Sequence, residues 1–172
     1  MKEFINKSIC EGCGVELPAI EGPIHAYAIS SPACWKMCGE VLTREYSNSE
    51  YAQINRLTSD AYAIQHPGFE DPRAIQSVSV HLLSLYLIFE KNYHLTQATQ
   101  AIDSLIKYHK NKFIYLERPN NLGSLTIYDV WKAKNIEEHI AIVKEWAKTA
   151  YDAWSLHKSY LEELANQWLK SR

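Results

Sequence analysis

The sequence predicts a mainly α-helical bundle with a small zinc-knuckle-like segment at its N-terminal end. Gly and Pro number only six each in 172 residues, and runs of β-branched residues are few, which favours helices over strands. Capping residues also precede several segments in which apolar side chains recur at helical spacing. The first 31 residues differ, since two of the four cysteines lie there among Gly and Pro residues. We therefore expect a single domain over 1–172, with a cysteine-rich segment at 1–31 and a helical core at 32–172.

The first elements follow from turn and capping signals. Gly and Pro residues make the segment before residue 31 irregular or weakly stranded, and one short strand is expected at 24–29. Ser31 is a favourable N-cap and Pro32 suits the first helical position, which predicts a helix over 32–46. Residues 47–50 cap a second helix at about 50–66. The His-Pro-Gly sequence at 66–68 ends it, because the residue before Pro disfavours helical geometry.

The middle of the chain repeats this pattern. Asp71 and Pro72 start a helix over 72–90 that is apolar nearly all round, so we expect it to be the central buried helix. A fourth helix is expected at about 97–110. Residues 113–126 predict a structured loop, after which Thr126 caps a short helix to about Lys134.

The last segment, 135–169, is predicted to be helical because its apolar and aromatic residues follow one continuous seam from His139 to Trp168. So long a helix is unusual in a compact domain, and we expect any bend to fall near Trp154 and Ser155.

Composition and charge exclude several classes of function. The formal net charge is −2, with Lys and Arg scattered along the chain, so no basic field is available to bind nucleic acid. No apolar run approaches the roughly 20 residues that a membrane helix needs, and the N-terminal residues lack the apolar region of a signal peptide. We therefore expect a soluble, cytoplasmic protein that contacts neither nucleic acid nor membrane.

The spacing of cysteine and histidine residues predicts a zinc site. Zinc prefers four thiolate or imidazole donors in a tetrahedron, and Cys10 and Cys13 supply two of them from one tight turn. Cys34 lies in the first turn of the capped helix, where a thiolate is favoured. The predicted ligands are Cys10, Cys13, His25 and Cys34, with Cys38 as the alternative to His25, since Cys38 is one helical turn beyond Cys34.

Other interpretations of these cysteines remain open. Cys38 is also suited to packing as a small apolar residue, as free cysteines often do. A redox role for Cys10 and Cys13 is disfavoured, because thioredoxin-like pairs open a helix after a strand, whereas this pair lies in a Gly-rich and Pro-rich stretch.

Several longer motifs resemble a bacterial family of uncharacterised proteins, catalogued as a domain of unknown function. The resemblance runs from Cys10 to about His157 and is carried by CxxCG at the N-terminus, GPIHAYAISSPACW, DAYAIQHPG at 60–68, QSVSVHLLSL at 76–85 and WAKTAYDAWSLHK at 146–158. It implies no catalytic residues. It favours Cys34 over Cys38 as a ligand, because the family pattern does not mark the position of Cys38 with a cysteine.

Polar groups in the helical core suggest a second pocket made by Asp60, His66, His81 and His157. The simpler interpretation is a buried hydrogen-bond network, since buried polar groups need partners. The alternative gathers the three imidazoles around a metal or a small ligand, because side chains from different helices of a bundle can build such a site. As an analogy, this resembles helical bundle proteins whose three histidines bind a divalent metal.

Two hypotheses about function follow. The first is a zinc-binding helical protein in which the metal is structural and the chain acts as a binding or interaction module for an unknown small molecule or protein. The second is a metal-dependent enzyme, of hydrolase or thiol-transferase type, that uses the His-lined pocket. The sequence predicts neither the substrate nor the oligomeric state.

Overall fold

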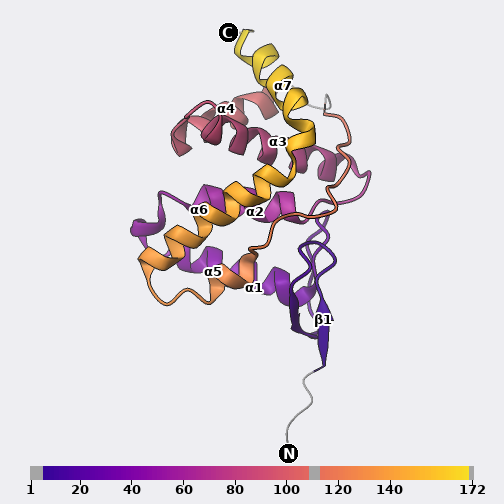
Figure 1. Ribbon diagram of the computed structural model, residues 1–172, viewed down its shortest axis with the longest axis vertical. Coiled ribbons are helices and arrows are strands. Elements are labelled where there is room, and N and C mark those ends of the chain that lie inside the picture. The colour runs from indigo at the N-terminus through magenta and orange to yellow at the C-terminus, as the bar shows by residue number, and fades with distance from the viewer. Residues whose placement is uncertain (1–5, 109–112, 171–172) are drawn as a thin grey trace, which may run out of the picture.

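The computed structural model describes residues 6–108 and 113–170. Within these ranges the chain forms a two-stranded hairpin, seven α-helices and two short 3-10 helices (Figure 1). In chain order they are β1 Lys7–Ile9, β2 Glu16–Pro18, α1 Pro32–Tyr46, η1 Ser49–Tyr51, α2 Asn55–Gln65, α3 Pro72–Phe89, α4 Leu95–Tyr108, α5 Ile127–Trp131, α6 Ile136–Ala153, η2 Ser155–His157 and α7 Lys158–Lys170.

The mainly helical fold predicted from the sequence is confirmed. Helix α3 contacts α2, α4, α6 and α7, and ten of its residues are buried, as its apolar sequence predicts. Helix α2 also packs against α1 and α6. These helices enclose a core of aliphatic residues in which the indoles of Trp146 and Trp154 are almost fully buried.

The helix starts agree with the capping signals. The Ser31 hydroxyl accepts from the backbone N–H of Cys34 at 3.2 Å at the start of α1. Asp71 accepts from the N–H of Arg73 at 2.8 Å at the start of α3. Such bonds satisfy N–H groups that have no partner within the helix. The predicted break in the last helical segment is also present, since α6 ends at Ala153 and η2 separates it from α7.

Two local predictions are wrong. Residues 24–29 form bends rather than a strand, because Nδ1 of His25 accepts from the backbone N–H groups of Tyr27 and Ala28 and turns the chain. The helix expected from residue 50 begins only at Asn55, after the separate turn of η1. The weakly stranded segment before residue 31 contains the hairpin of β1 and β2, paired antiparallel with Ser8 opposite Leu17. The positions of these strands were not predicted, because each is only three residues long.

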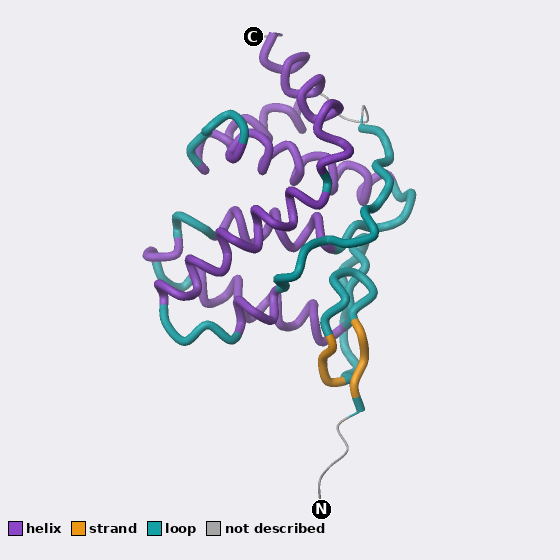
Figure 2. Tube along the Cα trace, viewed as in Figure 1, coloured by secondary structure: helices purple, strands orange, loops and turns teal. Residues whose placement is uncertain are grey.

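The longest loops run along one side of the helices, next to the hairpin (Figure 2). The loop over 113–126 is anchored by the buried side chains of Leu116 and Leu122. It is also anchored by Gln65, whose amide donates to the carbonyls of Leu122 and Leu125 at 2.9 and 2.7 Å. This side of the molecule holds the candidate site.

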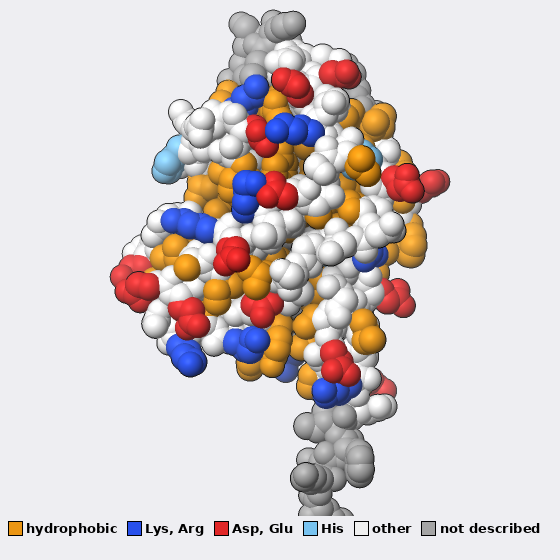
Figure 3. All heavy atoms as spheres, in the orientation of Figure 1, with side chains coloured by type: hydrophobic (Ala, Val, Ile, Leu, Met, Phe, Trp, Pro, Cys, Tyr) orange, Lys and Arg blue, Asp and Glu red, His pale blue; other side chains and the backbone are white. Residues whose placement is uncertain are grey.

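The surface carries both signs of charge. Basic and acidic side chains are interspersed on the face seen in Figure 3. No helix in the described ranges combines the length and the apolar character that crossing a bilayer requires.

Candidate metal centre

Four side chains that could hold a metal ion come together from three parts of the chain. They are Cys10, Cys13, Cys34 and His66, and their donor atoms all lie within 4.8 Å of one another. We refer to them as the Cys3His cluster. Sγ of Cys34 lies 3.4 Å from Nε2 of His66 and 3.9 Å from Sγ of Cys13. Metal–sulfur bonds of about 2.3 Å in a tetrahedron place neighbouring sulfurs roughly 3.8 Å apart, so these separations suit one tetrahedral ion.

The first two cysteines are held by a tight turn at the end of the hairpin. The N–H of Gly14 donates to the carbonyl of Cys10 at 2.8 Å, and the N–H of Cys10 donates to the carbonyl of Val15 at 2.9 Å. Gly14 has a φ of 78°, a left-handed conformation that glycine adopts without a steric penalty. Both thiols of the turn therefore face the same side.

The other two donors come from the ends of two helices. Cys34 lies in the first turn of α1, and His66 is the C-cap residue of α2. Helices α1 and α2 pack against each other, and the chain reverses direction between them. The start of α1 therefore lies beside the end of α2, which brings Cys34 and His66 together.

Hydrogen bonds outside the cluster orient the donors. Nδ1 of His66 lies 2.7 Å from the carbonyl oxygen of Tyr62, so Nδ1 carries a hydrogen and Nε2 presents its lone pair to the cysteines. The Tyr62 ring stacks on the imidazole at 3.9 Å, and its hydroxyl donates to Sγ of Cys34 at 3.7 Å. Sγ of Cys10 accepts from the N–H of Ser31 at 3.4 Å. Partners of this kind fix the tautomer and orientation of metal ligands.

The thiols perturb one another strongly. Hydrogen bonds from Cys13 and then Cys34 hold the pKa of Cys10 far below its ordinary value. The hydrogen bond to Cys10 raises the pKa of Cys13 to about 12, and hydrogen bonds to Cys10 and Cys13 raise that of Cys34 as well. One thiolate can thus be stabilised by its two neighbours, whereas ionising all three requires a cation among them. The donor set fits a divalent metal ion.

The structure places His66 where the sequence suggested His25 or Cys38. His25 lies outside the Cys3His cluster, with Nδ1 accepting from Tyr27 and Ala28 at 3.3 and 3.1 Å. Burial, followed by the charges of His66 and His81, lowers the pKa of His25. Cys38 is buried and also outside the cluster, and burial raises the pKa of its thiol to about 12, so it packs as a neutral side chain.

The four residues suggested for a second pocket are divided among three places. His66 belongs to the Cys3His cluster, and Nε2 of His157 lies 2.8 Å from the carbonyl oxygen of Glu117. Asp60 and His81 do meet, with Oδ1 and Nδ1 2.6 Å apart. No group of metal-binding side chains forms around His81 within the described ranges.

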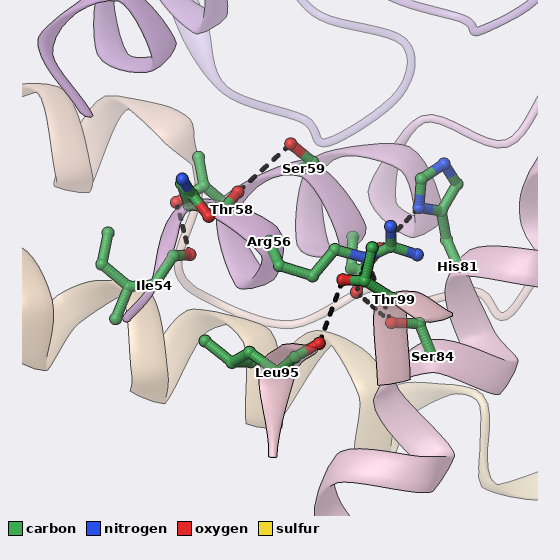
Figure 4. A network of polar contacts seen from close by, with 10 residues as sticks. Ile54, Arg56, Thr58, Ser59, His81, Ser84, Leu95 and Thr99 are labelled. Atoms are coloured by element: carbon green, nitrogen blue, oxygen red, sulfur yellow. Dashed lines mark hydrogen bonds and ion pairs between the residues drawn. The ribbon is translucent and has the colours of Figure 1, made fainter. Parts of the chain in front are cut away.

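A polar network surrounds the carboxylate of Asp60, whose side chain is fully buried. Besides His81, it accepts from the Ser84 hydroxyl at 2.6 Å and from Nε of Arg56 at 3.1 Å. Figure 4 shows the side chains of Arg56, His81 and Ser84 turned toward one another between α2 and α3. This arrangement combines the buried ion pair with an oriented imidazole.

A second buried pair of an imidazole and a carboxylate was not predicted from the sequence. Nε2 of His139 lies 2.7 Å from Oε1 of Glu45, and both side chains are at most 1% exposed. The Thr58 hydroxyl donates to the same oxygen at 2.7 Å. Glu45 occurs in an ordinary helical pattern, and its partner is 94 residues away, so no local signal marks it.

A helical protein with an N-terminal Cys3His cluster of metal-binding geometry is the class that the fold and the site define. The chain belongs to a family of unknown function, DUF5946, whose model matches residues 8–155. The matched region contains the whole cluster and the Asp60 network. No curated protein and no solved structure matches the chain.

Proposed function

We propose that this protein binds one zinc ion through Cys10, Cys13, Cys34 and His66, and that the ion is structural. The observation that carries the proposal is the convergence of four donor atoms within 4.8 Å from three separate segments. Three sulfur donors and one imidazole at tetrahedral spacing are typical of structural zinc sites. Hard cations such as magnesium and calcium prefer oxygen ligands, which the cluster lacks.

The donor count supports a structural role for the zinc. Four protein ligands complete the tetrahedron, so no position stays open for a reacting water, which a catalytic zinc site keeps. Three of the four residues are buried and Cys13 is partly buried. The ion would join the hairpin turn to the start of α1 and the end of α2, and so hold the N-terminal segment against the helices.

In this proposal the protein works as a binding or interaction module whose surface is kept in shape by the zinc. A metal-dependent enzyme is the second candidate. The observation that favours it is the 2.6 Å contact between the buried Asp60 and His81, since such pairs orient an imidazole for proton transfer. With His66 in the Cys3His cluster and His157 on a backbone carbonyl, His81 is the one of the three suggested imidazoles that lies beside Asp60.

Metal content of purified variants tests the proposed ligands. We expect about one zinc per chain in the wild type, and loss of it in Cys13→Ser and in His66→Ala, because each removes one donor. The matched controls are Cys38→Ser and His25→Ala, which change the same residue types outside the cluster and should keep the zinc. Zinc retained by His66→Ala but lost from His25→Ala would refute the ligand set. A second metal that disappears in His81→Ala would favour the enzyme.

A further inference from the structure

A small cavity lies between α1, α2, α3 and the bend around His25, apart from the Cys3His cluster. Its volume is about 160 Å³, and none of the four cluster residues lines it. Three aromatic side chains and two imidazoles are among its walls: Tyr27, Trp35, Tyr62, His25 and His81. The walls of the cavity therefore combine aromatic rings with side chains able to form hydrogen bonds, among them also Ser59 and Ser77.

The tautomer of His81 is determined by Asp60. Its Nδ1 lies 2.6 Å from the buried carboxylate, so Nδ1 carries the hydrogen and Nε2 of the neutral ring is an acceptor. In Figure 4 the second ring nitrogen of His81 points away from this contact. Arg56 and Ser84 hold the carboxylate in place at 3.1 and 2.6 Å. His81 is thus a cavity-lining residue whose neutral ring has its acceptor at Nε2.

The tautomer of His25 is the opposite one. Nδ1 of this ring accepts from two backbone N–H groups, those of Tyr27 and Ala28. The hydrogen of the neutral ring is therefore on Nε2, which makes Nε2 a donor. A donor nitrogen cannot bind a metal ion through a lone pair, so the two imidazoles together suit an organic ligand better than a metal.

We propose that this cavity binds a small aromatic molecule that carries one hydroxyl or ring N–H group. The hydrogen of that group is donated to Nε2 of His81, and a hydroxyl oxygen can in turn accept from Nε2 of His25. The size agrees, because a cavity of about 150 Å³ accommodates a benzene ring. Aromatic walls favour a flat ring through edge-to-face and offset contacts. This inference goes beyond the structural zinc site and does not depend on the identity of the metal.

Phenol and toluene are matched probes for the zinc-loaded chain of 172 residues, since they have the same number of heavy atoms and differ in the hydroxyl group. Binding is followed by nitrogen-15 NMR of the histidine side chains. We expect the free protein to show the Nδ1–H tautomer of His81. Phenol should shift the Nε2 signal of His81 and bind about tenfold more tightly than toluene, as one additional hydrogen bond predicts.

Variants separate the hydrogen bond from simple filling of the cavity. His81→Leu removes the acceptor and should lower phenol affinity about tenfold while toluene affinity changes little. His94→Leu, at an exposed position outside the cavity, is the matched control and should bind phenol as the wild type does. If His81→Leu fails to fold, the comparison of phenol with toluene and the His81 tautomer in the wild type still decide the question.

Three results would overturn the proposal: equal affinity for phenol and toluene, no binding of either, or an Nε2–H tautomer of His81. Zinc content is measured in every sample. Loss of phenol binding with full zinc content contradicts only this inference, whereas loss of zinc from the wild type contradicts only the proposed metal site.

Discussion

Gly12 is the residue that lets His66 approach the cysteines. A Cβ atom at position 12 would lie 2.2 Å from Cδ2 of His66 and 2.2 Å from the carbonyl oxygen of Ile29. Real Cβ atoms do not approach other atoms so closely, and one of these neighbours is backbone. The guanidinium of Arg118 also donates to the carbonyls of Glu11 and Gly12 at 3.0 and 2.6 Å. The cysteine turn thus packs closely against the imidazole of His66 and is also held by Arg118.

The substitution Gly12→Ala should therefore weaken metal binding strongly. The added methyl group pushes His66 or the turn away from the cluster, and we expect the variant to lose most of its zinc and to unfold at a lower temperature. Metal analysis and thermal denaturation measure both effects. The control is Gly39→Ala, because a Cβ there meets nothing within 4 Å. Gly39 lies within α1, so this control should stabilise the protein by about 0.5–1 kcal/mol. Full zinc content in Gly12→Ala would contradict this interpretation.

At the scale of elements, the end of α2 organises the side of the molecule that carries the site. Asp60 holds His81 of α3, and Tyr62 supports the ring of His66. Gln65 reaches two other elements, since its amide donates to two carbonyls of the 113–126 loop and its Oε1 accepts from the indole N–H of Trp146 at 2.8 Å. Gly68 allows the carbonyl of Tyr27 to approach, because a Cβ would lie only 2.0 Å from it. The motif at 60–68 is therefore explained by contacts with four parts of the chain.

Replacing Gln65 by leucine should destabilise the fold without removing a metal ligand. The substitution leaves the indole N–H of Trp146 and two loop carbonyls without their partner. Each buried polar group left unsatisfied costs about 1–3 kcal/mol, so we expect the free energy of unfolding to fall by at least about 2 kcal/mol. Urea denaturation measures it. Gln100→Leu, at an exposed position of α4, should change it by less than about 0.5 kcal/mol. Equal stabilities of the two variants would show that the Gln65 contacts are unimportant.

At the scale of the whole molecule, the hydrophobic core and the Cys3His cluster hold different parts of the chain. Helices α2, α3 and α6 pack directly on one another and bury most of the large apolar side chains. The segment before α1 has only two three-residue strands and few buried side chains, among them Cys10 and Leu17. So short a hairpin is not stable by itself in water. Its position therefore depends on contacts with the rest of the chain, which include the Cys3His cluster and the hydrogen bonds from Arg118 to Glu11 and Gly12.

Removing the metal should loosen the N-terminal segment before the helices. With a chelator we expect a lower melting temperature and faster amide hydrogen exchange and proteolysis over residues 7–31, while most of the helical circular dichroism remains. The physical reason is that metal binding supplies folding free energy to segments that have little core of their own. Adding zinc back should restore the protection. An unchanged melting temperature and unchanged exchange in the apo protein would rule out a structural role.

Much of the fold could be predicted because helix signals are local. The caps at Ser31 and Asp71 follow from neighbouring residues, and the break after Ala153 follows from the unusual length of the last helical segment. The structure has all three. The turn around His25 was predicted to be a strand because its apolar and polar residues alternate. The alternation does not reveal that the imidazole accepts from two backbone N–H groups and turns the chain. The contact between Asp60 and His81 agrees with the sequence analysis, which suggested both residues for one polar network.

Helix topology makes His66 a further candidate for the fourth donor of the cluster, although it does not choose between His66 and His25. Helices α1 and α2 are joined by a short connection, so an antiparallel pair was the natural expectation. Helix α1 is about 22 Å long and α2 about 16 Å at 1.5 Å per residue. Such a pair brings the end of the second helix near the start of the first, and hence His66 near Cys34. Proximity in the chain favoured His25 instead, but its Nδ1 is already engaged by its own turn.

By itself, the sequence determined the helical class, the helix starts and the cysteines that can form part of a metal site, because these depend on caps, periodicity and side-chain chemistry. Only the tertiary structure decided that His66 stands beside those cysteines and that His25 and His81 share one cavity. Those results depend on which helix ends meet and on which ring nitrogen each neighbour engages. Packing between distant segments decides which helix ends meet, and no local pattern of residues encodes it.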